Sequence, residues 1–210
     1  MPKSWPFERY VDRYDGWFEE NAAVYGSELA AVRELLPDTG TGVEIGVGTG
    51  RFAAPLDVGY GVEPSEKMAL VAAERGIKVV RGQAERLPFC SECFDYALMV
   101  TVICFLDDVF RALSEAGRVL KARGALVVGF IDADSPLGRE YEKHKATSQF
   151  YREARFFRAK VLGNLLEKAG YDDLVFRQTV FGLGDDQVRE QPAEDGFGRG
   201  AFVVVRGLCR

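Results

Sequence analysis

The clearest chemical signature is a set of three glycines spaced two apart, Gly46, Gly48 and Gly50, directly after the apolar stretch 42–45. Glycines let a loop approach a ligand closely, and the free N–H groups of a following helix attract oxygen atoms. The dinucleotide pattern G-x-G-x-x-G requires glycine where Arg51 stands, and the Gly-Lys-Ser/Thr of a Walker A loop is absent. The loop therefore predicts a nucleotide-like ligand that neither common phosphate pattern describes.

A carboxylate follows the next predicted strand. Glu63 comes directly after the stretch 58–62, nineteen residues after Glu44. Neighbouring parallel strands bring their carboxyl ends to one crevice, where ligands of open α/β sheets bind. A carboxylate at that place can accept hydrogen bonds from both hydroxyl groups of a ribose. We therefore expect a ligand with a free ribose rather than a 2′-phosphate.

Other reactive side chains are few. The single histidine, His144, excludes a metal site with two histidine ligands, and no metal site is predicted. His144 is a candidate general base by position, although its charged neighbours favour an exposed helix face. Cys90 and Cys93 precede the fourth predicted strand, about 20 Å from the crevice at ~3.3 Å of rise per residue, and a redox or metal role for them stays open. Cys104 follows that strand, so thiol-based chemistry is kept as an alternative.

Aromatic residues mark the N-terminal region. Tyr10, Tyr14 and Trp17 are four and three residues apart, so they share one face of a helix predicted over 7–20. They either cover the ligand and exclude water, or hold the helix on the core. Tyr14 is the candidate for direct contact with the ligand.

From residue 41 onward, short apolar stretches alternate with amphipathic segments, which is typical of a parallel sheet covered on both faces. The prediction is an α/β, doubly wound, Rossmann-like fold with a mostly parallel seven-stranded sheet and an antiparallel edge hairpin. The predicted strands are 42–45, 58–62, 77–81, 94–102, 125–131, 173–181 and 200–206. The predicted helices are 7–20, 28–36 with Ser27 as its cap, a short one from 51, 65–75, 107–120, 137–145 and 158–168.

Composition limits the classes of function. The chain has 210 residues, 47% of them hydrophobic, and a formal net charge of −5. This length predicts one domain, and the negative charge makes nucleic acid an unlikely partner. The longest nearly apolar run is about ten residues, whereas a membrane-spanning helix needs about 20, so no membrane span is expected. A cytoplasmic location is the expectation, and the oligomeric state is left open.

Several motifs together resemble those of class I S-adenosylmethionine (SAM)-dependent methyltransferases, in particular the small-molecule "type 11" group. Residues 43–52 (VEIGVGTGRF) are similar to the first motif of that family and 61–65 (GVEPS) to the second. Residues 82–89 (GQAERLPF), with Ser91, Phe94 and Asp95, resemble the third, and 118–121 with Gly124 resemble the stretch before strand five. The resemblance covers about residues 40–132.

The resemblance implies a role for each matching residue. Glu44 would lie near the methionine amino group, and Gly46, Gly48 and Gly50 would form the loop beside the methionine and ribose. Glu63 would hold the ribose hydroxyls. The remaining implied contacts are Pro64, Gln83, Ala84 and Glu85 around the adenine, with Thr101 and Tyr14 toward the methionine. Gln83 stands where the family usually has Asp, and an amide can still accept the adenine hydrogen bond.

The resemblance also implies a division of the chain and a reaction. Residues 1–40 would form a helical lid, 41–131 the SAM-binding core, 132–160 a substrate-side insertion, and 161–210 the last helix and edge hairpin. The reaction would transfer the SAM methyl group to a small-molecule nucleophile, leaving S-adenosylhomocysteine (SAH). The alternatives are a nicotinamide-dependent oxidoreductase, which Arg51 disfavours, and a non-catalytic SAM- or nucleotide-binding module.

The distribution of charge bears on the substrate. Residues 139–160 hold seven basic and three acidic side chains, whereas 185–195 hold five acidic and one basic. The basic segment lies where substrate is expected to enter, which suggests an anionic small molecule. The alternative is that the two segments pair with each other or face water.

Overall fold

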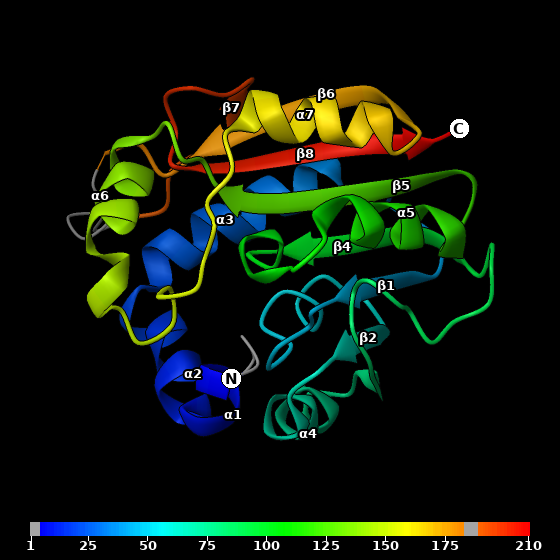
Figure 1. The fold of residues 1–210 in the computed structure, drawn as a ribbon, viewed down its shortest axis with the longest axis horizontal. Coiled ribbons are helices and arrows are strands. Elements are labelled where there is room, and N and C mark those ends of the chain that lie inside the picture. The colour runs from blue at the N-terminus through cyan, green and yellow to red at the C-terminus, as the bar shows by residue number, and fades with distance from the viewer. Residues whose placement is uncertain (1–4, 183–188) are drawn as a thin grey trace.

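The computed structural model describes residues 5–182 and 189–210, and it is built around one mixed sheet (Figure 1). The strand order is β3-β2-β1-β4-β5-β8-β6-β7. Pairing is parallel from β3 to β5, whereas β8 is antiparallel to both β5 and β6. The bounds are β1 Gly42–Ile45, β2 Tyr60–Glu63, β3 Lys78–Arg81, β4 Phe94–Val100, β5 Leu120–Ile131, β6 Tyr171–Thr179, β7 Glu194–Asp195 and β8 Phe202–Cys209.

The predicted α/β fold with an antiparallel edge is confirmed, but the sheet has eight strands rather than seven. The additional strand, β7, has two residues and pairs with β6 at the edge. So short a strand lies below the length at which apolar alternation can be recognised in a sequence. The other seven strands correspond to the seven predicted ones.

The alternation of side chains along the strands gives the sheet two buried faces. Along β4, Phe94, Ala97 and Met99 pack on one side, with α5 and α7. Tyr96, Leu98 and Val100 pack on the other side, with α3 and α4. Because successive side chains in a strand point to opposite faces, a continuous apolar run is what a strand covered on both faces requires.

Most predicted helices are confirmed, with shifted ends. The observed helices are α1 Trp5–Arg9, α2 Val11–Glu20, α3 Ala22–Leu35, α4 Glu66–Glu74, α5 Val109–Val119, α6 Pro136–His144 and α7 Ala159–Lys168, with 3-10 turns at Ile103–Phe105 and Lys145–Thr147. Side-chain oxygens of Ser65, Asp108 and Ser135 accept hydrogen bonds at the starts of α4, α5 and α6. The short helix expected from residue 51 is wrong, because residues 51–57 form turns.

The N-terminal prediction is wrong in two details. The helix expected over 7–20 is two helices that break at Tyr10, and the break lets the Glu8 carboxylate accept a hydrogen bond from the Ser65 hydroxyl at the start of α4. Ser27 is not a helix cap, because α3 begins at Ala22. Its hydroxyl donates to the Ala23 carbonyl at 2.7 Å and accepts from the Gln191 N–H at 2.8 Å, so a tertiary contact uses the group.

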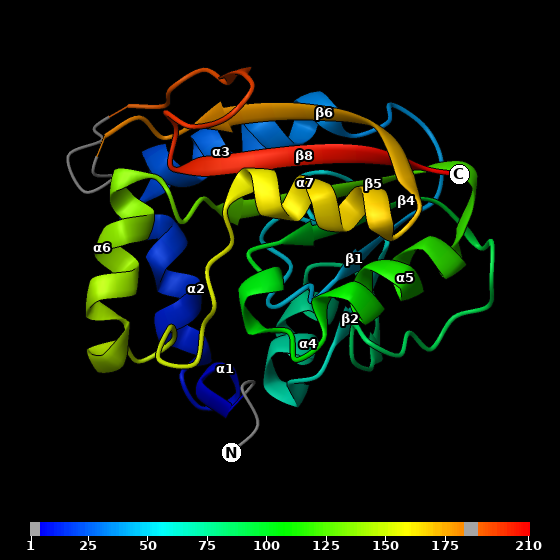
Figure 2. The ribbon, with the colours of Figure 1, turned by 45° about the horizontal axis from the view of Figure 1, so that its top comes forward.

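The helices α1, α2 and α6 lie beyond the carboxyl ends of the parallel strands (Figures 1 and 2). In Figure 2, α6 and α2 both lie at the end of the molecule toward which β4 and β5 point. This placement encloses the space where an open α/β sheet binds its ligands. None of the described helices is long and apolar enough to cross a membrane.

Candidate active site

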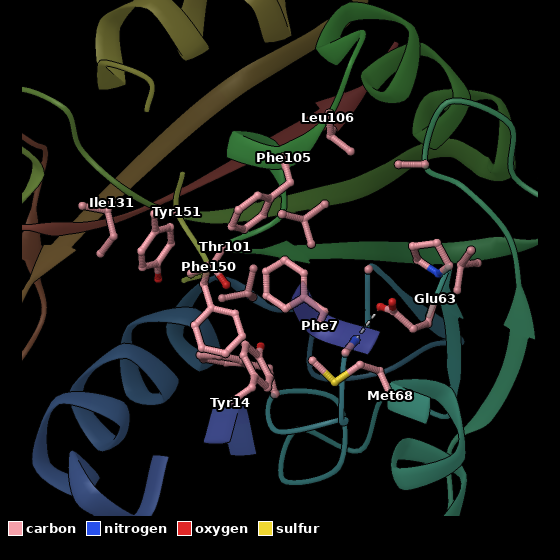
Figure 3. A pocket seen from close by; sticks show the side chains of 18 of the residues that line it. Phe7, Tyr14, Glu63, Met68, Thr101, Phe105, Leu106, Ile131, Phe150 and Tyr151 are labelled. Atoms are coloured by element: carbon pink, nitrogen blue, oxygen red, sulfur yellow. Dashed lines mark hydrogen bonds between the residues drawn. The ribbon is translucent and has the colours of Figure 1, made fainter. Parts of the chain in front are cut away.

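A cavity of about 670 Å³ opens between the carboxyl ends of the strands and the N-terminal helices (Figure 3). Figure 3 shows Glu63 toward one side of it, Tyr151 and Ile131 toward the other, and Thr101 and Phe105 between them. Nine of the eleven predicted contact residues line this cavity, namely Tyr14, Gly46, Gly48, Glu63, Pro64, Gln83, Ala84, Glu85 and Thr101. The other two, Glu44 and Gly50, do not line it.

The glycine loop is held in a conformation that favours glycine. Gly46 and Gly48 have φ angles of 74° and 53°, in the left-handed region that other residues rarely adopt. A Cβ on Gly46 would lie 2.2 Å from Cγ2 of Val102. Gly50 also has a positive φ, but its Cα faces the core, where a Cβ would lie 2.5 Å from Cδ1 of Ile77. Gly50 therefore serves packing, whereas Gly46 and Gly48 form the cavity wall.

Glu63 ends β2 and fastens the loop to it. One carboxylate oxygen accepts the Gly48 N–H at 3.0 Å (Figure 3), and the other accepts the Ser65 N–H at 2.8 Å. Burial raises the pKa of Glu63 to about 7, although these two N–H groups oppose the shift. Each oxygen keeps a further lone pair, so the carboxylate can still accept two hydroxyl groups from the cavity.

Glu44 is buried on β1, and one of its carboxylate oxygens, Oε2, has no hydrogen-bond partner among the described residues. Burial raises the pKa of this group, and the Ala53 N–H acts in the opposite direction. A buried polar atom without a partner costs free energy. Because Glu44 does not itself line the cavity, the fit to SAM rests on Glu63, whose remaining lone pairs suit the two hydroxyl groups of a ribose.

The part of the cavity wall where the adenine is expected to lie is made from loops. Pro64, Gln83 and Ala84 line the cavity, and the Glu85 carboxylate accepts hydrogen bonds from the Asp107 and Asp108 N–H groups at 3.0 and 3.4 Å. Glu85 therefore ties the loop after β3 to the start of α5. This supports the wall on which the adenine is expected to lie.

Thr101, directly after β4, has a φ of 54°. A positive φ in a β-branched residue is an outlier that the surrounding structure must hold, and such residues cluster at functional sites. Its N–H donates to the Gly129 carbonyl on β5 at 2.8 Å, which keeps the residue at the end of the sheet. Thr101 is thereby fixed at the centre of the cavity.

An ion-pair cluster holds the lid to the glycine loop. The Asp15 carboxylate on α2 accepts hydrogen bonds from Arg51 at 2.9 and 2.6 Å and from Arg75 at 3.0 and 2.7 Å. Partial burial alone would raise the pKa of Asp15, but the hydrogen bonds from the two guanidinium groups outweigh it and hold that pKa far below its usual range. Arg51, which departs from the dinucleotide pattern, thus fastens α2 over the loop.

The aromatic residues of the lid divide into two groups. Tyr14 and Trp17 line the cavity, and Tyr14 packs edge-on against Phe7 and Phe18 at ring distances of 5.7 and 5.4 Å. Tyr10 lies in the break between α1 and α2, packs on Trp5, and is not part of the wall. The predicted shared face therefore applies to Tyr14 and Trp17 only.

The remaining reactive residues lie outside the cavity wall. His144 is on an exposed face of α6 and pairs with Glu140 at 2.8 Å, so its candidacy as a base gains no support. Cys90 and Cys93 form a disulfide in the loop before β4. Cys104 is buried, its thiol donates to the Thr101 carbonyl at 3.4 Å, and it borders a separate small space rather than the cavity.

The charged segments do not line the cavity as expected. None of the basic residues between Arg139 and Lys160 belongs to its wall, and Arg158 pairs with Asp134 while Lys145 pairs with Glu142. Part of the acidic segment, including Asp185 and Asp186, lies outside the described residues. The basic segment therefore gives no support to the prediction of an anionic substrate.

Sequence reasoning missed the part of the cavity farthest from the glycine loop. Glu28 on α3 lines it, together with aromatic residues from α6 and the segment after it. The pattern of α3 held a signal: Glu28 is four residues after Val24 and three before Ala31, so it shares their buried face. The expectation that α3 starts at Glu28 concealed this.

Comparison with known proteins agrees with this geometry. The family model described as "Methyltransferase domain" matches residues 43–128. An uncharacterized protein of Methanocaldococcus jannaschii is 42% identical over 95% of this chain and 96% of its own length. A demethylmenaquinone methyltransferase of Thermobifida fusca is 32% identical over 58% of each chain.

Among solved structures, a Thermotoga maritima protein described as a SAM-dependent methyltransferase, possible histamine N-methyltransferase, superposes with a TM-score of 0.96. It is 51% identical, and the match covers 99% of this chain and all of that one. This identity over nearly the whole of both chains shows that the chain belongs to the SAM-dependent methyltransferases.

Proposed function

We propose that this SAM-dependent methyltransferase acts on a small molecule that binds in the far part of the cavity, beneath α2 and α6. The observation that carries the proposal is the shape of the cavity. It continues past Thr101 into a space walled by aromatic and aliphatic side chains from the lid and the 132–160 segment. Its volume of about 670 Å³ lies in the range of small-molecule sites.

The chain's contribution to the reaction is positioning and exclusion of water. SAM supplies a methyl group on a positively charged sulfur, which departs as neutral SAH. Glu63 and the glycine loop hold the nucleoside end. The aromatic lid over Thr101 keeps the transfer region dry, which aligns the nucleophile with the methyl group.

The acceptor atom is the open part of this proposal. The Thermotoga protein is described as a possible histamine N-methyltransferase, which makes small amines the first class to test here. The oxidoreductase alternative loses support because Arg51 is engaged by Asp15 and Glu19 and cannot give way to a pyrophosphate.

The experiment that tests the proposal uses SAM with a radiolabelled methyl group, the purified protein and an extract from the source cells. We expect label in the fraction of small molecules and none in protein or nucleic acid. Label confined to macromolecules would overturn the small-molecule proposal. No label in any fraction, with tight SAH binding by calorimetry, would instead favour the non-catalytic binding module.

We also infer that the enzyme works in the cytoplasm, where a thiol such as that of Cys209 stays reduced. In a reducing compartment the disulfide between Cys90 and Cys93 would open, since it lies in an exposed loop. Cell fractionation with thiol labelling tests this inference, and recovery of the protein from an extracellular fraction would contradict it.

A further inference from the structure

The carboxyl group of Glu28 lies inside the cavity without a partner. The residue is 5% exposed, and it sits in the middle of α3, among the residues that line the far part of the cavity. No hydrogen bond or ion pair joins its side chain to any residue in 5–182 or 189–210. An unpaired buried carboxyl group is costly, so its presence in a cavity wall points to a ligand that supplies the missing partner.

Aromatic rings surround the same region. Tyr14, Tyr141 and Tyr151 line the cavity with Glu28, and the rings of Tyr141 and Tyr151 stack at 5.1 Å. Burial chiefly raises the pKa values of Tyr14 and Tyr151, and the Glu28 carboxylate adds to both shifts, so the three groups are close in space. The faces of aromatic rings attract cations, most strongly where water is excluded.

The arginine side chains that line the cavity do not neutralise the charge of a Glu28 carboxylate. Arg13 donates to the Gln149 side chain, and Arg111 donates to the Glu85 carbonyl at 3.0 Å. Both are exposed at the cavity margin, whereas Glu28 is buried. The far part of the cavity therefore combines one unneutralised carboxyl group with several ring faces.

We propose that Glu28 binds the amino group of a small amine substrate and accepts a proton from it before methyl transfer. This inference rests on the proposed function, because it assigns the class of small molecule and the residue that selects it. The chemistry of the site, a carboxylate among ring faces, matches an ammonium group and disfavours an anion of the same shape.

The proton balance of the step is complete. The substrate enters as R–NH3+ and pairs with the Glu28 carboxylate, and a proton that the buried acid holds in the empty cavity leaves to water as the ammonium binds. One N–H bond breaks and its proton goes to the carboxylate, which leaves neutral R–NH2 and a protonated Glu28. The nitrogen lone pair forms the new C–N bond, the C–S bond breaks with its electron pair on sulfur, and R–NH2–CH3+ and SAH result.

Burial raises the pKa of Glu28 to about 8. A general base works best when its pKa is near the working pH, because it must both hold and release the proton. Glu28 meets this condition without a second acidic group beside it, since burial alone causes the shift.

The test measures binding of matched small molecules to the protein saturated with SAH, by calorimetry. The probes are 2-phenylethylamine, its alcohol 2-phenylethanol, its acid phenylacetic acid, and histamine. We expect at least one amine to bind about tenfold more tightly than the alcohol and the acid, which corresponds to about 1.4 kcal/mol. Amines that bind no better than the alcohol and the acid, or not at all, would overturn the inference.

Two variants assign the effect to Glu28. Glu28→Gln should lose about tenfold in amine affinity while its affinities for the alcohol and for SAH change less than about twofold. Glu34→Gln, on the same helix but outside this cavity, is the matched control and should behave as the wild type. An unchanged ratio of amine to alcohol affinity in Glu28→Gln would refute the assignment, and Glu28→Asp provides a charged variant should the amide fail to fold.

The outcome separates this inference from the proposed function. If the protein methylates a neutral or anionic small molecule while Glu28→Gln retains full kcat and KM, the role of Glu28 is wrong and the small-molecule function stands. If labelled methyl groups enter macromolecules only, the proposed function itself fails.

Discussion

At the scale of single residues, Glu63 has the most specific assignment. It carries two backbone hydrogen bonds and faces the cavity, so it both shapes the loop and is expected to bind the ribose. We predict that Glu63→Gln weakens SAH binding by about 10- to 100-fold, since hydrogen bonds to a charged acceptor contribute about 1.5–3 kcal/mol each. Calorimetric titration with SAH measures the change.

The control for this prediction is Glu66→Gln, an exposed carboxylate on the first turn of the adjacent helix α4. Its SAH affinity should stay within about twofold of the wild type. Equal losses in both variants would mean that net charge near the site, rather than contact with the ribose, controls binding.

Thr101 allows a test of strain at a functional position. We predict that Thr101→Gly is more stable than Thr101→Ala by about 1 kcal/mol, because both lose the side chain but only glycine adopts a φ of 54° without strain. Denaturant unfolding of the two variants measures the difference. Equal stabilities would indicate that the backbone at this position changes conformation in the absence of ligand.

At the scale of elements, the Asp15 cluster decides how firmly α2 covers the site. Asp15 receives four hydrogen bonds from Arg51 and Arg75, which belong to the glycine loop and to the end of α4. We predict that Asp15→Asn destabilises the protein by roughly 1–3 kcal/mol, because two guanidinium groups lose their charged acceptor. We also expect faster hydrogen exchange in residues 5–20.

Asp12→Asn, on the same helix and exposed, is the comparison variant and should leave both the unfolding free energy and the exchange unchanged. If Asp15→Asn leaves exchange in α1 and α2 at wild-type rates, other contacts hold the lid. The aromatic packing of Tyr14 and Phe18 would then be the first candidate.

The elements also show how far the sequence predicts this structure. The central strands were predictable because burial on both faces demands continuous apolar runs, as in 94–100. The break at Tyr10 and the start of α3 at Ala22 were not, since side chains of this region bond to residues far along the chain, Glu8 to Ser65 and Ser27 to Gln191. The nucleoside residues sit on recognisable motifs, whereas Glu28 belongs to no motif and is placed in the cavity wall by the buried face of α3.

At the scale of the whole molecule, charge is arranged by depth. Some carboxylates outside the cavity have lowered pKa values, as in Glu115, where hydrogen bonds from Arg118 chiefly cause the shift. The carboxyl groups around the cavity, Glu28, Glu44 and Glu63, have raised pKa values because they are buried. The ligand-free protein therefore holds its acidic groups in two states that respond to pH in opposite directions.

This arrangement predicts that the ligand-free protein is less stable at pH 8 than at pH 6. Unfolded Glu28 and Glu63 titrate near 4.5, whereas in the folded protein their pKa values are about 8 and about 7. Between these limits the folded state binds more protons, so the unfolding free energy falls as pH rises, by up to about 1.4 kcal/mol per pH unit and group. The stabilisation that comes from these raised pKa values is fully present below pH 4.5. It is lost as the pH rises through the pKa values of the folded protein. Carboxylates with lowered pKa values change the unfolding free energy only at acidic pH, so they do not offset this loss.

From pH 6 to pH 8, titration of these two groups lowers the unfolding free energy by roughly 3 kcal/mol. This corresponds to a melting temperature lower by about 6–12 °C for a chain of this size. Thermal unfolding at constant ionic strength measures the shift. Glu28→Gln should reduce the pH dependence by at least about half, because the amide does not titrate, while Glu34→Gln should retain it. A wild-type melting temperature that does not fall between pH 6 and pH 8 would show that Glu28 has a charged partner in solution, and the cavity would then lack the free carboxylate that an amine requires.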